Sequence, residues 1–134
     1  MSGSFLLDTN IVVALFAHDA AALANLASAD EVYLPSIVAG ELFYGAYNST
    51  QTTQNLARIE ALVATSVVLD SNAATARHYG RIKGELRLKG RPIPDNDIWI
   101  AALAYQHGLT LVSRDTHFGH IANLTIVTWA TPPP

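Results

Sequence analysis

The chain has 134 residues, half of them hydrophobic, with a formal net charge of −3. This is enough for one well-filled core, so we expect a single domain over 1–134 with an extended Pro-rich tail at 131–134. The absence of cysteine excludes disulfides, thiolate nucleophiles and cysteine-based zinc or iron–sulfur sites. No apolar run reaches the ~18 residues of a membrane span, and the opening "MSGSFLLDTN" lacks the basic region of a signal peptide, so we expect a cytoplasmic protein.

The apolar residues fall into short runs that alternate with longer helical patterns. Runs rich in Val, Leu and Ile predict strands at 5–7, 32–34, 67–69, 109–112 and 124–129. Apolar residues at helical spacing predict helices at 10–28, 36–47, 51–65, 71–89 and 96–107. Strands that are apolar on both faces are typical of a parallel sheet covered on both sides. The alternation therefore predicts an α/β fold, a three-layer sandwich whose central, mostly parallel five-stranded sheet is flanked by helices.

Acidic residues stand where several of these elements begin or end. Asp8 follows the first strand and Asp115 the fourth, and the carboxyl ends of parallel strands form the ligand-binding edge of such sheets. Glu41 lies on an otherwise apolar face of the second helix, and Asp97 stands at the start of the last helix. We expect these four carboxylates to meet at one edge, with Asp95 near them.

Each acid also has a simpler explanation. Asp95 or Asp97 could act only as an N-cap, which contributes ~1 kcal/mol, and Asp8 and Asp115 could be ordinary turn residues. Glu41 is harder to explain in this way, because a carboxylate on an apolar helix face is rarely left unpaired. Separate explanations also do not account for the convergence of four acids.

Carboxylates that meet at one edge need compensation. Two unit charges 4 Å apart repel by ~4 kcal/mol at an effective dielectric of ~20, and Arg91 and Arg114 are the only basic residues close to any of these acids in sequence. Either raised pKa values keep some carboxylates protonated or a divalent cation lies among them. Oxygen ligands favour Mg²⁺ or Mn²⁺ over Zn²⁺. Because no helical pattern surrounds His117 and His120, we interpret them as loop residues, or His117 as a neighbour of phosphate, rather than as a zinc pair.

The negative net charge conceals a basic segment. Six of the eight Lys and Arg residues lie between Arg77 and Arg91 and are opposed only by Glu85, so this segment carries +5 and the remainder −8. Such segregation is typical of a protein that holds a phosphate backbone in one place and cations in another, although a solvated helix face gives the same pattern. The residues expected to hold a phosphate backbone are Arg77, Arg81, Lys83, Arg87, Lys89 and Arg91.

Four blocks of the sequence together resemble a known family. They are "LLDTNIV", "PSIVAGELFYGA", "PIPDNDIWIAALA" and "LTLVSRDTHF". In order and spacing they resemble the PIN-domain ribonucleases, most closely the VapC-type toxins of bacterial toxin–antitoxin pairs. The similarity covers nearly the whole chain, and any one block alone would be weak.

The resemblance implies roles for individual residues. The metal-binding and catalytic set would be Asp8, Glu41, Asp97 and Asp115, with Mg²⁺ or Mn²⁺ as cofactor. Residues that orient this set would be Thr9, Asn10 and Ser113, with Asp95 treated as a further residue just outside it. The family often has an acid where this chain has His117, which leaves open how a second metal would be held.

The resemblance also implies an activity and partners. A water activated by the metal would attack RNA in line and leave a 5′-phosphate and a 3′-hydroxyl. The substrate would be a tRNA or rRNA loop, the chain would be the toxin of a type II toxin–antitoxin system, and its partners would be a cognate antitoxin and a second copy of itself. The apolar stretches "IVVALFA" and "IVAGELFYGAY" would suit an antitoxin groove or simply be core faces.

Two rival functions stay open at this point. The first is a PIN-like domain that binds RNA or a partner without catalysis. The second is a phosphatase or receiver-like domain that uses Asp8 as an aspartyl-phosphate nucleophile. The phosphatase pattern requires a second acid where Asn10 stands, and neither aspartyl-phosphate reading explains Glu41.

Overall fold

The computed structural model describes residues 3–134; Met1 and Ser2, which begin both the expected domain and the stretch considered for a signal peptide, lie outside the described residues. Its five strands form one sheet in the order β3-β2-β1-β4-β5, and every neighbouring pair is parallel. The strands are β1 Ser4–Leu7, β2 Glu31–Pro35, β3 Val67–Leu69, β4 Thr110–Val112 and β5 Ile126–Val127. The predicted parallel five-stranded sheet is confirmed.

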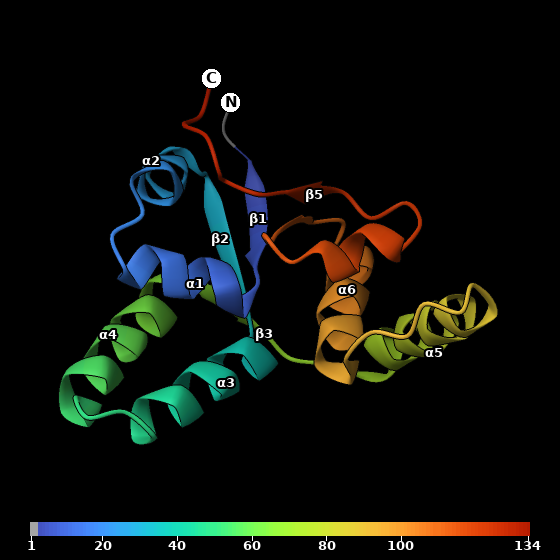
Figure 1. Ribbon diagram of the computed structural model, residues 1–134, viewed down its shortest axis with the longest axis horizontal. Coiled ribbons are helices and arrows are strands. Elements are labelled where there is room, and N and C mark those ends of the chain that lie inside the picture. Colours follow the sequence, from blue (N-terminus) through green and yellow to red (C-terminus); the bar gives the residue numbers. More distant parts are fainter. Residues whose placement is uncertain (1–2) are drawn as a thin grey trace.

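Helices cover the sheet and link its strands. They are α1 Thr9–Phe16, α2 Ala20–Ser28, α3 Ser36–Tyr47, α4 Thr52–Thr65, α5 Ala73–Leu88 and α6 Asp95–His107, with a short 3-10 helix η1 at Thr116–His120. In Figure 1, α1, α2 and α4 lie on one side of β1 and β2, while α5 and α6 lie on the other. The first turns of α1, α3 and α6 come together below the strands, which defines the edge where the candidate site lies (Figure 1).

The single helix predicted over 10–28 is wrong, because the chain turns sharply inside it. His18 adopts a positive φ of 61°, and the carboxylate of Asp19 accepts a 3.0 Å hydrogen bond from the Ala22 amide, which begins α2. No single helix in the described part of the chain is long and apolar enough to cross a membrane; α1 and α2 reach that length and hydropathy only together, and they are bent by 108°.

The strand predicted over 124–129 is also too long. Only Ile126 and Val127 pair with β4, because Asn123 before them and Trp129 after them both have positive φ angles, 62° and 49°. As an edge strand, β5 needs pairing on one side only.

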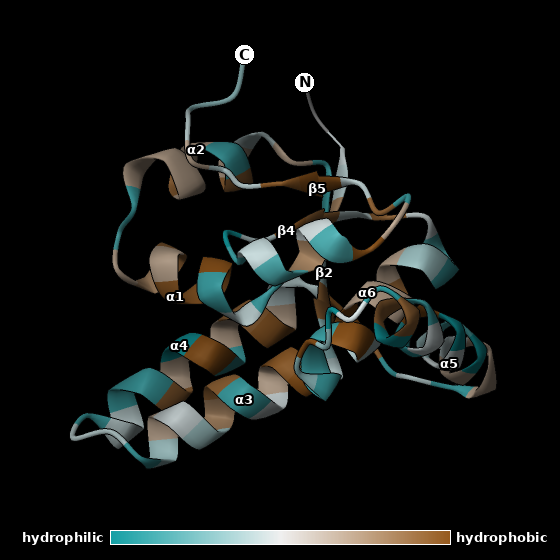
Figure 2. Cartoon of the chain, turned by 45° about the vertical axis from the view of Figure 1, so that its right-hand side comes forward, coloured by the Kyte–Doolittle hydropathy of each residue, from teal (hydrophilic) through white to brown (hydrophobic). Residues whose placement is uncertain are grey.

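The core explains why the elements pack as they do. β1 pairs with β2 on one side and β4 on the other, so Leu6 and Leu7 are completely buried, as are Leu111 and Val112 of β4. Figure 2 shows brown, apolar strands, while α3, α4 and α5 carry teal bands. The prediction of Gly108 as the C-cap of the last helix is confirmed, with a φ of 63°.

Candidate active site

The register of the sheet places Asp8 beside Ser113. Leu7 pairs with Val112, and the Asp8 amide continues this ladder by donating to the Val112 carbonyl over 3.1 Å. Asp8 follows β1 and Ser113 follows β4, so these two residues lie side by side just beyond the last pair of the ladder. The Ser113 hydroxyl donates a buried 2.7 Å hydrogen bond to Oδ2 of Asp8, and the Thr9 amide donates to Oδ1 over 2.8 Å.

Asp115 is held two residues beyond the end of β4. Its amide donates to Oγ of Ser113 over 3.0 Å, and its carboxylate accepts a 2.9 Å bond from the His117 amide, so it caps η1. This turn brings the His117 ring to the carboxylates, with Nδ1 3.1 Å from Oδ1 of Asp115 and 3.5 Å from Oδ2 of Asp97. The prediction that His117 lies in a loop is wrong, because it belongs to the short helix η1. The signal that pointed to the site was its position where related proteins often carry an acid.

Glu41 reaches the same place from α3. Oε1 of Glu41 accepts a 3.2 Å hydrogen bond from the Thr9 hydroxyl, which ties α3 to the first residue of α1. The residue as a whole is exposed, whereas its helical neighbours Val38 and Leu42 are buried. Glu41 therefore lies at the border of the core and faces the acidic hollow.

Asp97 does not cap its helix. α6 begins at Asp95 with Pro94 as its N-cap residue and no side-chain capping bond, so the N-cap explanation for Asp95 or Asp97 is wrong. Asp97 turns toward His117, whereas Asp95 accepts bonds from Nζ of Lys83 over 2.9 Å and from the Tyr79 hydroxyl over 3.1 Å. The pKa of Asp95 is lowered, chiefly by its hydrogen bond from Lys83.

These side chains surround an open hollow of about 370 Å³ at the carboxyl edge of the sheet. The first turns of α1 and α6 contribute to its lining, and the partial positive charge of a helix N-terminus favours anionic groups. The lining residues include no lysine or arginine and are Asp8, Thr9, Asn10, Glu41, Pro94, Asp95, Asn96, Asp97, Asp115 and His117. The four predicted acids and the polar residues Thr9 and Asn10 are thus brought together.

The crowding of acids changes how readily they ionise. Burial, followed by repulsion from Asp8 and Asp115, raises the pKa of Asp97 to about 6, although His117 opposes the shift. Burial also raises the pKa of Asp8, against the hydrogen bonds from Ser113 and Thr9. Partial loss of water and the nearby charge of Asp8 raise the pKa of Glu41. The protein alone therefore leaves this negative charge incompletely compensated.

The donor set fits a hard divalent cation. Carboxylate oxygens are the ligands that Mg²⁺ and Mn²⁺ take, and a cation among them would favour the ionised forms that burial disfavours. Asp97, Asp115 and His117 each offer one ligand atom, and these atoms all lie within 4.8 Å of one another. Such a site can hold a phosphate oxygen and activate water.

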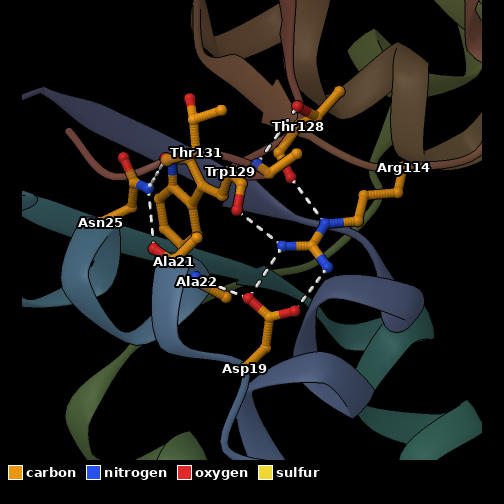
Figure 3. Close-up of polar contacts among 9 residues, drawn as sticks. Asp19, Ala21, Ala22, Asn25, Arg114, Thr128, Trp129 and Thr131 are labelled. Atoms are coloured by element: carbon orange, nitrogen blue, oxygen red, sulfur yellow. Dashed lines mark hydrogen bonds and ion pairs between the residues drawn. The ribbon is translucent and has the colours of Figure 1, made fainter. Parts of the chain in front are cut away.

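Arg114 does not compensate the acids, although it stands between Ser113 and Asp115. Arg114 does not line the hollow; Figure 3 shows its guanidinium facing Asp19, with which it forms two bonds of 2.9 and 3.1 Å. It also donates to the carbonyls of Thr128 and Trp129. Arg114 therefore fixes the loop that carries Asp115 against the start of α2 and the segment that follows β5.

The basic segment divides between two ends of the α5–α6 hairpin. Tyr79 stacks on Trp99 with ring centroids 4.2 Å apart, and Arg81 lies 4.9 Å from the ring centroid of Tyr105. Thr75, near the start of α5, donates to Gln106 at the end of α6, whereas Lys83, farther along α5, pairs with Asp95 at the start of α6, so the two helices run antiparallel. Arg81 also pairs with Glu85. Tyr105 is eight residues beyond Asp97, which corresponds to ~12 Å of helix.

Arg77 and Arg81 therefore lie toward the end of the hairpin remote from the hollow. Lys83 and Arg87 share a surface with Pro92 and Ile93 at the near end, and Lys83 reaches the rim through Asp95. Lys89 donates to the His120 carbonyl over 3.2 Å.

Known proteins share this sequence and architecture. The PIN domain family matches residues 5–124. Ribonuclease VapC2 of Haemophilus influenzae is 35% identical over 128 residues, 93% of this chain and 97% of that protein. The tRNA(fMet)-specific endonuclease VapC of Shigella flexneri is 35% identical over 129 residues, which cover 94% of this chain and 98% of that protein. VapBC2 from Rickettsia felis, solved bound to a DNA fragment from its promoter, has a TM-score of 0.86 and 31% identity, covering 94% of this chain and 98% of that one. The chain therefore belongs to the PIN-domain family and, within it, to the VapC ribonucleases, as its four sequence motifs predict.

Proposed function

We propose that the protein is a Mg²⁺- or Mn²⁺-dependent endoribonuclease and the toxin of a type II toxin–antitoxin system. The observation that carries this proposal is the convergence of four carboxylates from four separate elements around one open hollow. The proposed metal-binding and catalytic residues are Asp8, Glu41, Asp97 and Asp115. Thr9 and Ser113 hold two of these carboxylates through hydrogen bonds, which supports a role in orienting them.

The reaction is hydrolysis of a phosphodiester bond. A bound divalent cation supplies a Lewis acid that neutralises phosphate charge and makes water acidic enough to react near neutral pH. One carboxylate of the cluster accepts a proton from the attacking water. The oxygen of that water forms the new bond to phosphorus while the bond to the 3′ oxygen breaks, and the departing 3′ oxygen takes a proton from solvent, which leaves a 5′-phosphate and a 3′-hydroxyl.

The substrate we propose is a single-stranded loop of tRNA or rRNA. The hollow is open rather than enclosed, so it suits a strand whose backbone is exposed, and a relative from Shigella flexneri is named as a tRNA(fMet)-specific endonuclease. Lys83, which reaches Asp95 at the rim of the hollow, and the exposed residues that follow it, Arg87, Lys89 and Arg91, would hold the RNA backbone without reading its bases. Since tRNA and ribosomes are cytoplasmic, we propose the cytoplasm as the place of action.

A second groove supports an antitoxin partner. Thr9 and Glu41 line both the acidic hollow and a mostly apolar groove of about 250 Å³ between α1, α3 and α4. Val13, in this groove, is 55% exposed. We propose that an apolar antitoxin segment occupies the groove and extends a basic side chain into the hollow, where it would meet the carboxylates.

The groove can be tested with the protein encoded beside the toxin gene. Val13→Glu is expected to weaken binding of that protein by at least tenfold, because a carboxylate replaces buried apolar area, while RNA cleavage persists. Leu23→Glu on α2, also partly exposed, is the matched control. Equal binding of Val13→Glu and the wild type would remove the groove from the interface.

We also propose that the toxin forms a homodimer. Tyr44 and Tyr47 on α3 and Leu88 at the end of α5 are exposed large apolar side chains, and association would cover such surface. Sedimentation equilibrium of the purified protein tests this. A monomer at every concentration used would refute it.

Cleavage of total bacterial RNA is the experiment that tests the nuclease. The purified protein is incubated with Mg²⁺, with Mn²⁺ or with EDTA, and the fragment ends are sequenced. We expect discrete, metal-dependent fragments with 5′-phosphates, and their loss in Asp97→Asn. Asp30→Asn is the matched control, because this exposed aspartate precedes β2 at the opposite edge of the sheet.

The same assay separates the rivals. If the wild type and Asp97→Asn behave alike with every metal, the nuclease proposal fails and a non-catalytic RNA- or partner-binding domain becomes the better account. An aspartyl-phosphate enzyme would instead accumulate a phosphorylated Asp8 with acyl phosphates, and Glu41→Gln would leave that step intact.

A further inference from the structure

His117 places a ring nitrogen between two carboxylates of the candidate site. Nδ1 lies 3.1 Å from Oδ1 of Asp115 and 3.5 Å from Oδ2 of Asp97. A nitrogen in this position has two uses: it carries a proton that pairs with the carboxylates, or it offers its lone pair to a cation that the carboxylates also bind. In both cases Nδ1 faces the space between the carboxylates of Asp97 and Asp115.

The backbone fixes this arrangement. The His117 amide donates to Oδ1 of Asp115 over 2.9 Å, so the two residues share one turn of η1. Phe118, the next residue, is completely buried and anchors the turn in the core. The Asp115 amide is in turn held by Ser113. The imidazole thus needs no refolding of the loop to reach the carboxylates.

The spacing of the three ligand atoms matches a single coordination sphere. In an octahedral ion with ~2.1 Å bonds, neighbouring ligand atoms lie about 3 Å apart, and the measured separations of 3.1 and 3.5 Å are close to this value. Opposite ligand atoms lie about 4.2 Å apart in the same geometry, and all three atoms fall within 4.8 Å of one another. One ion can therefore contact all three side chains after small movements.

We infer that Nδ1 of His117 is a ligand of the divalent ion, together with carboxylate oxygens of Asp97 and Asp115, and that it makes the site select Mn²⁺ over Mg²⁺. This inference rests on the proposed metal-dependent nuclease site. Mg²⁺ prefers oxygen ligands and keeps its waters, whereas a first-row transition ion such as Mn²⁺ accepts imidazole nitrogen. The histidine therefore gives Mn²⁺ an advantage that a cluster of carboxylates alone would not provide.

Pulsed electron paramagnetic resonance of the Mn²⁺-loaded full chain tests the ligand directly, because ¹⁴N bound to Mn²⁺ modulates the electron spin echo. We expect this modulation in the wild type, its loss in His117→Asp and His117→Gln, and its retention in His120→Ala. His120 is the matched control, since it is an exposed histidine of the same short helix. Thermal unfolding followed by circular dichroism verifies that each variant is folded.

Calorimetric titration with Mn²⁺ and with Mg²⁺ tests the selectivity. His117→Asp is expected to lower the ratio of Mn²⁺ to Mg²⁺ affinity by about tenfold or more, which is the lower range of the losses caused by changes around a metal. Because the substitution replaces nitrogen with oxygen and adds a negative charge, Mg²⁺ affinity is expected to stay equal or rise.

The outcomes separate this inference from the nuclease proposal. Mn²⁺ that binds without ¹⁴N modulation, or modulation that persists in both His117 variants, overturns the inference and leaves the nuclease standing. Mn²⁺-dependent ¹⁴N modulation without any RNA cleavage supports His117 as a ligand and refutes the nuclease. If the wild type binds no Mn²⁺, the inference is wrong together with the proposed cofactor.

Discussion

The guanidinium of Arg114 forms two hydrogen bonds, of 2.9 and 3.1 Å, with the carboxylate of Asp19, 95 residues earlier in the chain. Asp19 also caps α2 through the Ala22 amide. The pair therefore joins the loop that carries Asp115 to the turn between α1 and α2 (Figure 3). The hydrogen bond from Arg114, the largest cause, and that cap bond lower the pKa of Asp19 from 3.8 to about 2.

Asp19→Asn should make the stability of the protein less sensitive to acid. A pKa that is lowered by folding stabilises the folded state above the unfolded value of 3.8, and this contribution disappears as the pH falls toward about 2. We expect the wild type to exceed the variant in urea unfolding by a constant amount above about pH 5 and by a shrinking amount below about pH 4. A difference that persists unchanged into acid would assign the loss to the cap geometry rather than to the charge.

Asp97→Asn should stabilise the metal-free protein while abolishing cleavage. Folding raises the pKa of Asp97 from 3.8 to about 6, so the ionised carboxylate destabilises the folded state above about pH 6, and this cost vanishes below the unfolded value. The full shift corresponds to ~3 kcal/mol, and screening by water reduces it to roughly 1–2 kcal/mol. Urea unfolding in EDTA at about pH 7.5 and at about pH 4 measures the gain; a variant no more stable than the wild type at the higher pH contradicts the prediction.

Ser113→Ala should lower both the stability of the protein and the metal affinity of the candidate site. The Ser113 hydroxyl donates to Asp8 over 2.7 Å, accepts from the Asp115 amide over 3.0 Å and is almost completely buried. Its removal leaves a buried carboxylate short of a donor, which costs ~1–3 kcal/mol, and metal affinity is expected to fall ~10- to 100-fold. Thermal unfolding and Mn²⁺ titration measure the two effects.

Ser49→Ala is the control for this prediction. Ser49 likewise donates to a carbonyl, that of Ala46, over 2.7 Å and accepts from Asn55 over 3.0 Å, but it lies in the turn between α3 and α4. The Ser49→Ala variant should be less stable than the wild type but should bind Mn²⁺ with unchanged affinity. Equal losses of metal affinity in both serine variants would mean that Ser113 acts through general stability.

The sheet could be predicted from sequence because its strands are apolar on both faces and are separated by helices. The breaks were harder to predict. Apolar residues continue at helical spacing across His18, so nothing in the periodicity shows that its φ is positive, and only Asp19 in "HDAA" was available as an N-cap signal. β5 was overestimated because Thr128 and Trp129 are β-formers whose carbonyls are instead bound by Arg114.

The site was predictable where parallel topology alone brings residues together. Asp8 directly follows the central strand β1, and a strand paired in parallel with β1 places the residue after its own end beside Asp8. The sequence did not show which strand is that neighbour. The contacts of Arg114 and His117 depend on side-chain direction in the turn after β4 and in the short helix η1. Arg114 stands one residue before Asp115 and His117 two residues after it, yet His117 turns toward the acids and Arg114 toward Asp19. A sequence pattern without periodicity does not encode this difference.

The two halves of the basic segment should contribute unequally to RNA binding. Arg87 and Arg91 are exposed and follow Lys83, which reaches Asp95 at the rim of the hollow, while Arg77 lies beside Thr75, which contacts Gln106 at the end of α6. Binding is measured in the Asp97→Asn background, so that the RNA stays intact, over a range of salt concentrations. Each phosphate contact to a single strand contributes ~0.7 to the slope of log affinity against log salt.

Arg87→Gln combined with Arg91→Gln should therefore reduce this slope by up to about 1.4, because two phosphate contacts are lost, and should weaken binding to all sequences alike. Arg77→Gln is the matched control and should leave the slope unchanged. An equal reduction by Arg77→Gln would show that the RNA follows the whole length of α5. If neither variant changes the slope, the segment is a solvated helix face, and the RNA backbone must be held elsewhere.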